Sequence, residues 1–118
     1  MAYVDGFVLT VPRKKLAAYR RLSHSAGKVW RQHGALEYRE CVGDDLRVKM
    51  GVPFSKLAKV RPGETVVFSW IVFKSRAARD RVNAEVMKDP RITKTKNQPM
   101  PFDVKRMAYG GFTVLVDL

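Results

Sequence analysis

E-T-V-V-F-S-W-I-V-F, residues Glu64–Phe73, is the stretch that decides the fold. It is rich in β-branched and aromatic side chains, and its only charge is at its first position. Both alternating sets of side chains are largely apolar, whereas a strand with one wet face alternates polar and apolar residues. The sequence therefore predicts a strand that is covered on both faces. A chain of 118 residues can cover one face with its own helices, so we expect a second copy of the protein to cover the other.

The segments around this strand predict a single domain over residues 1–118 with the element order β-α-β-β-α-β. The expected elements are a strand over Tyr3–Val11, a helix from Pro12 to about His33, a strand over Ala35–Val42, the strand Glu64–Phe73, a helix over Arg76–Lys88 and a strand over Val104–Leu118. A long connection from Leu46 to Pro62 has room for a short helix, and Arg91–Pro101 is expected to be a polar loop. The pair Gly110-Gly111 predicts a bulge or bend in the last strand.

This element order is that of the ferredoxin-like α+β fold. Right-handed crossovers place both helices on one face of a four-stranded antiparallel sheet. The other face then carries more apolar surface than a monomer normally exposes. We therefore expect two sheets packed face to face in a homodimer with twofold symmetry, which is a dimeric α+β barrel.

The composition bounds the compartment. No apolar run is long enough to span a bilayer, and the first ten residues lack the charged start and cleavage region of a signal peptide. Cys41 is the only cysteine, which agrees with a reducing compartment and is typical of a small buried apolar residue rather than a nucleophile. The sequence thus predicts a cytoplasmic protein without membrane contact.

The charge is the unusual quantity of this chain. It carries 23 Lys and Arg against 11 Asp and Glu, a net charge of +12, and no acidic residue lies between Arg13 and Arg31. Such a surface is expected to bind polyanions weakly and without specificity. It also fits a solvated basic surface that keeps the protein soluble by self-repulsion, and the sequence leaves both interpretations open.

Four segments of the chain resemble the YbaA-like bacterial family of unknown function. They are Y-V-D-G-F at 3–7, E-C-V-G-D-D at 40–45, V-V-F-S-W-I-V-F-K-S-R-A-A-R-D at 66–80 and M-P-F-D-V-K-R-M-A-Y-G-G-F at 100–112. The resemblance covers nearly the whole chain and implies the dimeric α+β barrel superfamily, whose members place ligands between sheet and helices or within the barrel. It implies no established activity, so whether the chain is an enzyme stays open. The chain departs from the family at Val42, where an aromatic residue is common, and at Arg13-Lys14-Lys15, which replaces the usual carboxylate after the first proline.

Polar residues on otherwise apolar strands give the candidate pocket. If the first and last strands pair, Asp5 is expected close to Arg106 or Tyr109, at one mouth of the barrel. Arg106 or Lys105 would bind an anionic group there, and Asp5 or Tyr109 would donate or accept a proton. The alternative is a structural ion pair that fixes the strand register or the dimer contact. The complete candidate set is Asp5, Ser69, Asp103, Lys105, Arg106 and Tyr109.

No motif indicates a metal or a cofactor, and neither is expected. The chain has no Gly-rich phosphate loop, no zinc-ligand spacing and no nucleophile elbow, and His24 and His33 are too far apart on one helix to share a metal. The favoured function is therefore small-molecule binding, or a minor enzymatic role, in a barrel dimer. The alternatives are a basic protein associated with nucleic acid and a structural or regulatory dimer without a ligand.

Overall fold

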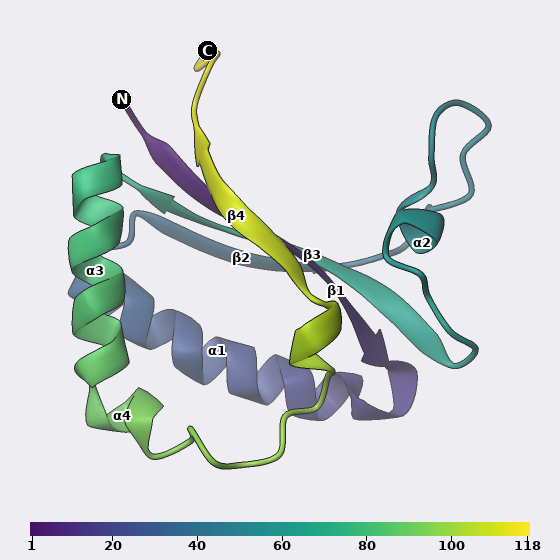
Figure 1. Cartoon of the computed structure of the whole chain (residues 1–118), viewed down its shortest axis with the longest axis horizontal. Coiled ribbons are helices and arrows are strands. Elements are labelled where there is room, and N and C mark those ends of the chain that lie inside the picture. The colour runs from purple at the N-terminus through teal and green to yellow at the C-terminus, as the bar shows by residue number, and fades with distance from the viewer.

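A computed structural model describes all of residues 1–118 and shows a four-stranded antiparallel sheet with its two long helices on one side (Figure 1). The strands follow the order β2-β3-β1-β4, so the predicted ferredoxin-like arrangement is confirmed. None of the helices combines the length and the apolar composition needed to cross a bilayer. The elements are β1 (Tyr3–Pro12), the 3-10 helix η1 (Arg13–Lys15), α1 (Leu16–His33), β2 (Glu37–Val42), α2 (Phe54–Leu57), β3 (Glu64–Phe73), α3 (Arg76–Lys88), α4 (Pro90–Thr93), the 3-10 helix η2 (Val104–Arg106) and β4 (Ala108–Thr113).

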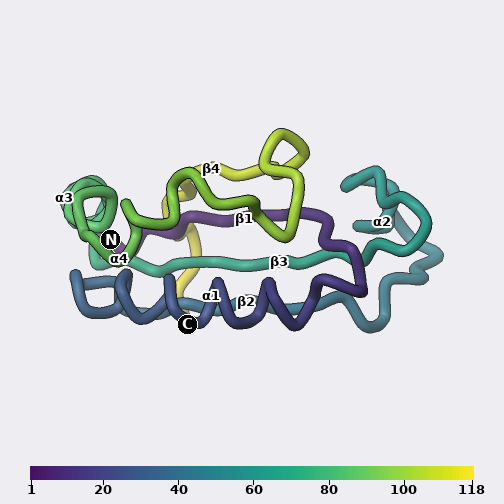
Figure 2. The backbone as a smooth tube through the Cα atoms, turned by 90° about the horizontal axis from the view of Figure 1, so that it is seen from below, coloured from purple at the N-terminus to yellow at the C-terminus, as the bar shows by residue number.

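The strand β3 lies at the centre of the sheet, between β1 and β2 (Figure 2), and has the predicted bounds. The side chains that it directs toward the helices are buried and pack in two clusters. Ile71 and Phe73 pack with residues of α1 and α3, whereas Val67 packs with Leu9 and Tyr19. The two clusters share Phe7 as a half-buried neighbour. The core thus lies between β1, β3 and the helices, as the apolar strand requires.

The last strand is shorter and more regular than predicted. Residues 104–106 form η2, β4 ends at Thr113, and the five residues after it lie outside the strand, although the Val114 N–H still donates to the Ala2 oxygen at 3.3 Å. The expected bulge is absent, because Gly110 and Gly111 pair in continuous register with Gly6 and Asp5 of β1. A side chain at Gly111 would place its Cβ only 2.4 Å from Oη of Tyr3. The glycine is therefore needed for the close approach of a ring, not for a bend.

The first helix, the strand β2 and the segment after α3 begin or end at slightly different residues than predicted. The first helix begins as the 3-10 turn η1 and becomes α-helical at Leu16, and β2 begins at Glu37. A single helical turn, α4, occupies the start of the expected loop, with the Asp89 side chain accepting a hydrogen bond from the Arg91 N–H as its cap.

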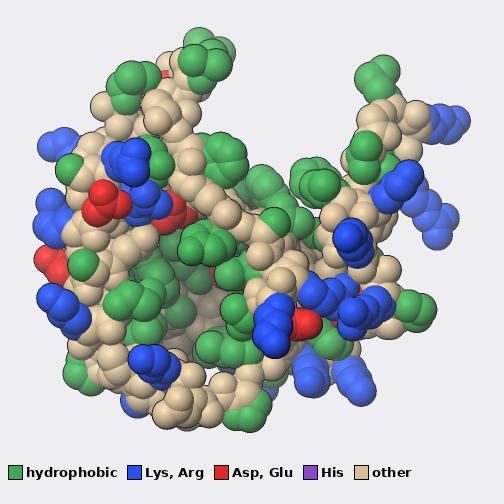
Figure 3. All heavy atoms as spheres, in the orientation of Figure 1, with side chains coloured by type: hydrophobic (Ala, Val, Ile, Leu, Met, Phe, Trp, Pro, Cys, Tyr) green, Lys and Arg blue, Asp and Glu red, His purple; other side chains and the backbone are tan.

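The second face of the sheet is open in the single chain. Two segments rise beside it, the tail that follows β4 and the segment of residues 43–63 with α2, which we call the arm (Figure 1). Figure 3 shows hydrophobic side chains between these two walls. Phe112 is 62% exposed on this face and Phe68 is 43% exposed, although Phe68 packs on Phe54 of the arm. Half of the predicted covering of β3 therefore comes from the chain's own helices, and the other half is not supplied within one subunit.

Candidate functional site

Asp5, the first residue of the predicted pocket, lies under α3 in a network of polar side chains. Its carboxylate accepts hydrogen bonds from Arg79 at 2.8 Å and from Asn83 at 3.2 Å, and Asn83 accepts one from the Trp30 indole at 2.9 Å. The Arg79 guanidinium also stacks over the Tyr3 ring at 4.8 Å. Asp5 is 4% exposed, and every strong partner it has belongs to the protein. The geometry is that of a structural ion pair that joins β1 to α3.

Arg106 lies elsewhere, so the expected approach of Asp5 to Arg106 is wrong. Two of its guanidinium nitrogens donate to the Glu64 carboxylate at 2.7 and 2.9 Å, and one donates to the backbone oxygen of Lys59 at 2.9 Å. Hydrogen bonds from Arg106 lower the pKa of Glu64 to about 2. Glu64 pairs with Pro12 in the sheet, whereas Asp5 pairs with Ile71, so the two ion pairs are separated along the strands. Asp5 pairs instead with Arg79 of α3, which was not among the predicted pocket residues.

The other predicted pocket residues do not converge on one point either. Ser69 is buried, next to Phe7 in the register of β1 and β3. Tyr109 stacks on Phe7 at 5.7 Å between ring centroids and is 71% exposed. Asp103 caps η2 by accepting from the Lys105 N–H, and the Lys105 side chain is exposed. As a single site at the mouth of a barrel, the set remains a prediction that the single chain does not assemble.

A different carboxylate, Glu40 of β2, forms a polar cluster between the sheet and α1. It accepts hydrogen bonds from the Tyr19 hydroxyl at 2.7 Å and from the Tyr38 hydroxyl at 2.8 Å. Burial, and after it the neighbouring Glu40 charge, raises the pKa of both phenols well above the ordinary range. Both hydroxyls therefore stay protonated and act as donors. The sequence signal for this cluster was Glu40 in the E-C-V-G-D-D segment, but the two tyrosines approach it only in the folded chain.

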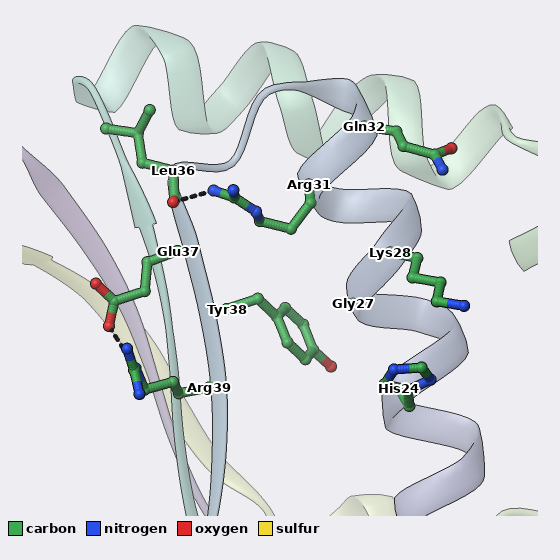
Figure 4. Close-up of a pocket in the computed structure, with 9 residues that line it drawn as sticks. All are labelled: His24, Gly27, Lys28, Arg31, Gln32, Leu36, Glu37, Tyr38 and Arg39. Atoms are coloured by element: carbon green, nitrogen blue, oxygen red, sulfur yellow. Dashed lines mark hydrogen bonds and ion pairs between the residues drawn. The ribbon is translucent and has the colours of Figure 1, made fainter.

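Tyr38 also forms the floor of a groove between α1 and β2 (Figure 4). Its ring lies against the α1 backbone at Gly27, where a side chain would place its Cβ only 2.6 Å from the ring. Glycine at this helical position therefore allows the ring to reach the helix. The groove has a volume of about 660 Å³, within the usual range for a small-molecule site. The lining residues are His24, Gly27, Lys28, Arg31, Gln32, Leu36, Glu37, Tyr38 and Arg39.

The groove is cationic. Arg31 donates to the backbone oxygens of Ala35 and Leu36, and Arg39 donates to Glu37 at 3.0 Å (Figure 4). Lys28 and His24 take part in none of the ion pairs of the structure. In a groove lined by both residues, the unpaired Lys28 ammonium can hold an anionic group and the Tyr38 ring can stack a flat one. Sequence reasoning missed this site because its residues come from a helix and a strand that each show ordinary patterning.

A family model described as "Protein of unknown function (DUF1428)" matches residues 2–104. The uncharacterized protein YbaA of Escherichia coli K12 and that of Shigella flexneri are each 43% identical to this chain over 117 residues, which is 99% of both chains.

Solved structures share the fold at low identity. Rv0793 from Mycobacterium tuberculosis superposes with a TM-score of 0.60 at 17% identity and covers 99% of this chain and 98% of its own. A dimeric ferredoxin-like protein from an uncultured marine organism superposes with a TM-score of 0.58 at 9% identity, with both chains fully covered. These structures support the ferredoxin-like fold, and the sequence match over the full length supports the family. The chain therefore belongs to the DUF1428 family of proteins of unknown function.

Proposed function

We propose that this protein is a homodimer that binds a small anionic molecule in the α1–β2 groove of each subunit. One observation carries the ligand class: the groove combines the aromatic floor of Tyr38 with the unpaired cation of Lys28. A ligand with a carboxylate or phosphate group on a flat ring would satisfy both features. The part-buried hydrogen bonds that Tyr19 and Tyr38 donate to Glu40 fix the position of the Tyr38 ring.

Aromatic anions test the groove directly. Trp30 lies 6.3 Å from Tyr38 between ring centroids, so its fluorescence reports on the floor of the groove. In a Trp70→Phe background, in which Trp30 is the remaining tryptophan, we expect saturable quenching by benzoate. Benzamide, which has the same shape without the charge, should bind far more weakly. Native mass spectrometry of the purified protein would in addition reveal a ligand that is retained from the cell.

Two lysine variants separate the groove from the general surface charge. Lys28→Ala should weaken benzoate binding severalfold, whereas Lys74→Ala, which removes an exposed charge in the turn before α3, should leave it unchanged. If benzamide bound as tightly as benzoate, or if the two lysine variants behaved alike, the proposed site would be wrong.

The proposed dimer rests on the open face of the sheet. Phe68 and Phe112 are exposed there, and the arm carries further apolar side chains that are largely exposed in the single subunit. A second copy would present the same face, so one twofold axis would cover both sheets and both arms at once. A dimeric ferredoxin-like protein is among the structures with this fold, which supports the same arrangement here.

Sedimentation velocity tests the dimer. The unmodified chain should sediment as a dimer, and Phe112→Asp should give a folded monomer because it places a charge on the covered face. Met87→Asp makes the same change at a residue of α3 that is 55% exposed and should remain dimeric. A folded monomer of the unmodified chain, or a dimeric Phe112→Asp variant, would contradict the face-to-face arrangement.

Association with nucleic acid is the second candidate function, and the distribution of ion pairs favours it. Among the 23 Lys and Arg, only Arg39, Arg79, Arg91 and Arg106 form ion pairs with carboxylates. The folded chain therefore keeps most of its positive charge available to a polyanion, which supports binding that weakens with salt.

A further inference from the structure

Three segments that are distant in the sequence meet at one corner of the molecule. The Arg13 N–H donates to the Gly63 oxygen at 2.8 Å, which joins η1 to the turn before β3. Arg106 of η2 reaches the same turn through Glu64 and the Lys59 oxygen. We call this place the basic corner. Its exposed cations are Arg13, Lys14, Lys15, Lys59, Arg61 and Lys105.

None of these six cations forms an ion pair. Glu64, which lines the same corner, already accepts hydrogen bonds from Arg106 and from the Arg61 N–H. Asp103 accepts from the Lys105 N–H as the cap of η2 and forms no ion pair. Figure 3 shows Lys and Arg side chains gathered at the lower right of the view, with acidic side-chain surface beside them. The positive charge of the corner is therefore not neutralised within the chain.

Folding does not explain this concentration of charge. Arg13, Lys14 and Lys15 precede α1, whose first turn has no acidic residue and whose start has no side-chain cap. Cations at this end oppose the helix dipole, and they also repel one another. An arrangement that costs stability in the free protein is accounted for if an anion occupies the corner.

A cleft runs through the basic corner. Its volume is about 530 Å³, and no large apolar side chain lines it. Arg13 and Lys14 form one side, and Arg61, Pro62 and Gly63 form the other. The cleft offers no aromatic surface on which a base could stack, so it suits phosphate groups rather than bases. Cations on three segments exceed what one phosphate needs and suit a chain of phosphates.

We propose that the basic corner binds the sugar-phosphate backbone of a nucleic acid strand, without reading its sequence. This inference rests on the second candidate function and adds the place and the contacted group. It is independent of the groove, which lies between α1 and β2 and is lined by none of the same residues. The expected binding is electrostatic, so it should weaken steeply with salt.

The test measures fluorescence anisotropy of a labelled single-stranded RNA of mixed sequence, from about 25 to about 200 mM NaCl. The corner variant is Arg13→Ala, Lys14→Ala and Arg61→Ala together. The control is Lys74→Ala, Arg76→Ala and Lys88→Ala, which lowers the net charge equally at exposed positions of α3 and the turn before it. The corner variant should reduce the slope of log affinity against log salt by about 2, since each lost phosphate contact removes about 0.7. The control should reduce it much less.

Three results would overturn the proposal. Equal losses in both variants would place binding on net charge alone, and would leave the second candidate function standing while removing the corner. No RNA binding at the lowest salt would remove both. Competition by inorganic phosphate at equal phosphate concentration would assign the corner to a small anion. Circular dichroism and thermal melting of both variants confirm that any loss comes from the changed charges and not from unfolding.

Discussion

The Asp5 carboxylate and the Arg79 guanidinium form the most enclosed ion pair of the molecule, with 6% and 18% of their side chains exposed. Asp5 lies on a strand face made of large apolar groups, which drew attention to it as a catalytic candidate. In the structure its carboxylate joins β1 to α3 through Arg79 and Asn83, and Asn83 in turn accepts a hydrogen bond from Trp30 of α1. A buried charge is tolerated only when it is paired in this way.

Arg79→Met tests the pair. The substitution leaves Asp5 buried without its cation, so we expect the free energy of unfolding to fall by about 3 kcal/mol in urea denaturation. Arg39→Met, which breaks the exposed pair with Glu37, should cost less than about 1 kcal/mol. Similar losses in the two variants would mean that burial does not decide the strength of the Asp5 pair.

Glu64 gives the molecule a pH-dependent contribution to stability. Arg106 lowers the pKa of Glu64 from its unfolded value to about 2. A lowered pKa in the folded state stabilises the protein above the unfolded pKa and loses this effect as the pH falls toward 2. The stability difference between the unmodified chain and Glu64→Gln should therefore be largest near neutral pH and shrink on acidification. Urea midpoints across this range would measure it, and a difference that grew in acid would contradict the assignment.

At the scale of elements, the arm is the segment whose shape the sequence explains least. Its exposed apolar side chains are Val48, Met50, Val52, Phe54 and Leu57. Phe54 packs on Phe68, whereas Met50, Val52 and Leu57 are at least 62% exposed and so contribute little to the stability of their own subunit. They fit an element that packs on a neighbouring subunit.

Replacing Met50, Val52 and Leu57 by serine separates these roles. Because these side chains are at least 62% exposed, the free energy of unfolding of the monomer should change little. The dimer should be weaker and dissociate at a higher protein concentration than the unmodified chain does. Analytical ultracentrifugation over a dilution series measures the second effect. An arm variant with unchanged self-association would show that the arm takes no part in the dimer.

For the molecule as a whole, the proposed dimer would make stability depend on assembly. If folding and pairing of two copies are linked, mass action stabilises the folded dimer as the protein concentration rises. A hundredfold rise should add about 2.7 kcal/mol of dimer stability, seen as a higher urea midpoint. The Phe112→Asp variant should show a midpoint that does not depend on concentration. A midpoint of the unmodified chain that was equally independent would contradict the dimer.

The charge of the whole chain has no such single consequence. What matters is that the fold gathers cations from η1, the turn before β3 and η2 at one corner. A count over the sequence could not locate this corner.

The helices and strands and their order along the chain could be predicted from the sequence, because they depend on local hydrophobic patterns and capping residues. The bounds of β3 and α3 follow from a continuous apolar run and from the Ser75 cap, and the β-α-β-β-α-β order leaves few topologies. The end of the last strand could not be predicted, because residues 114–118 are as apolar as β4 and only the length of β1 limits the pairing.

Which side chains contact one another follows from the folded structure and not from local sequence patterns. Asp5 pairs with Arg79 rather than with Arg106, and Glu40 accepts hydrogen bonds from Tyr19 and Tyr38. The Tyr38 ring contacts the helix at Gly27, where there is no side chain. These partners lie up to 74 residues apart, and periodicity gives the face on which a residue lies but not its position along that face. The pairing of charges and the shape of the groove depend on this position along the face. It is fixed by the strand register and by how far each helix extends along the sheet.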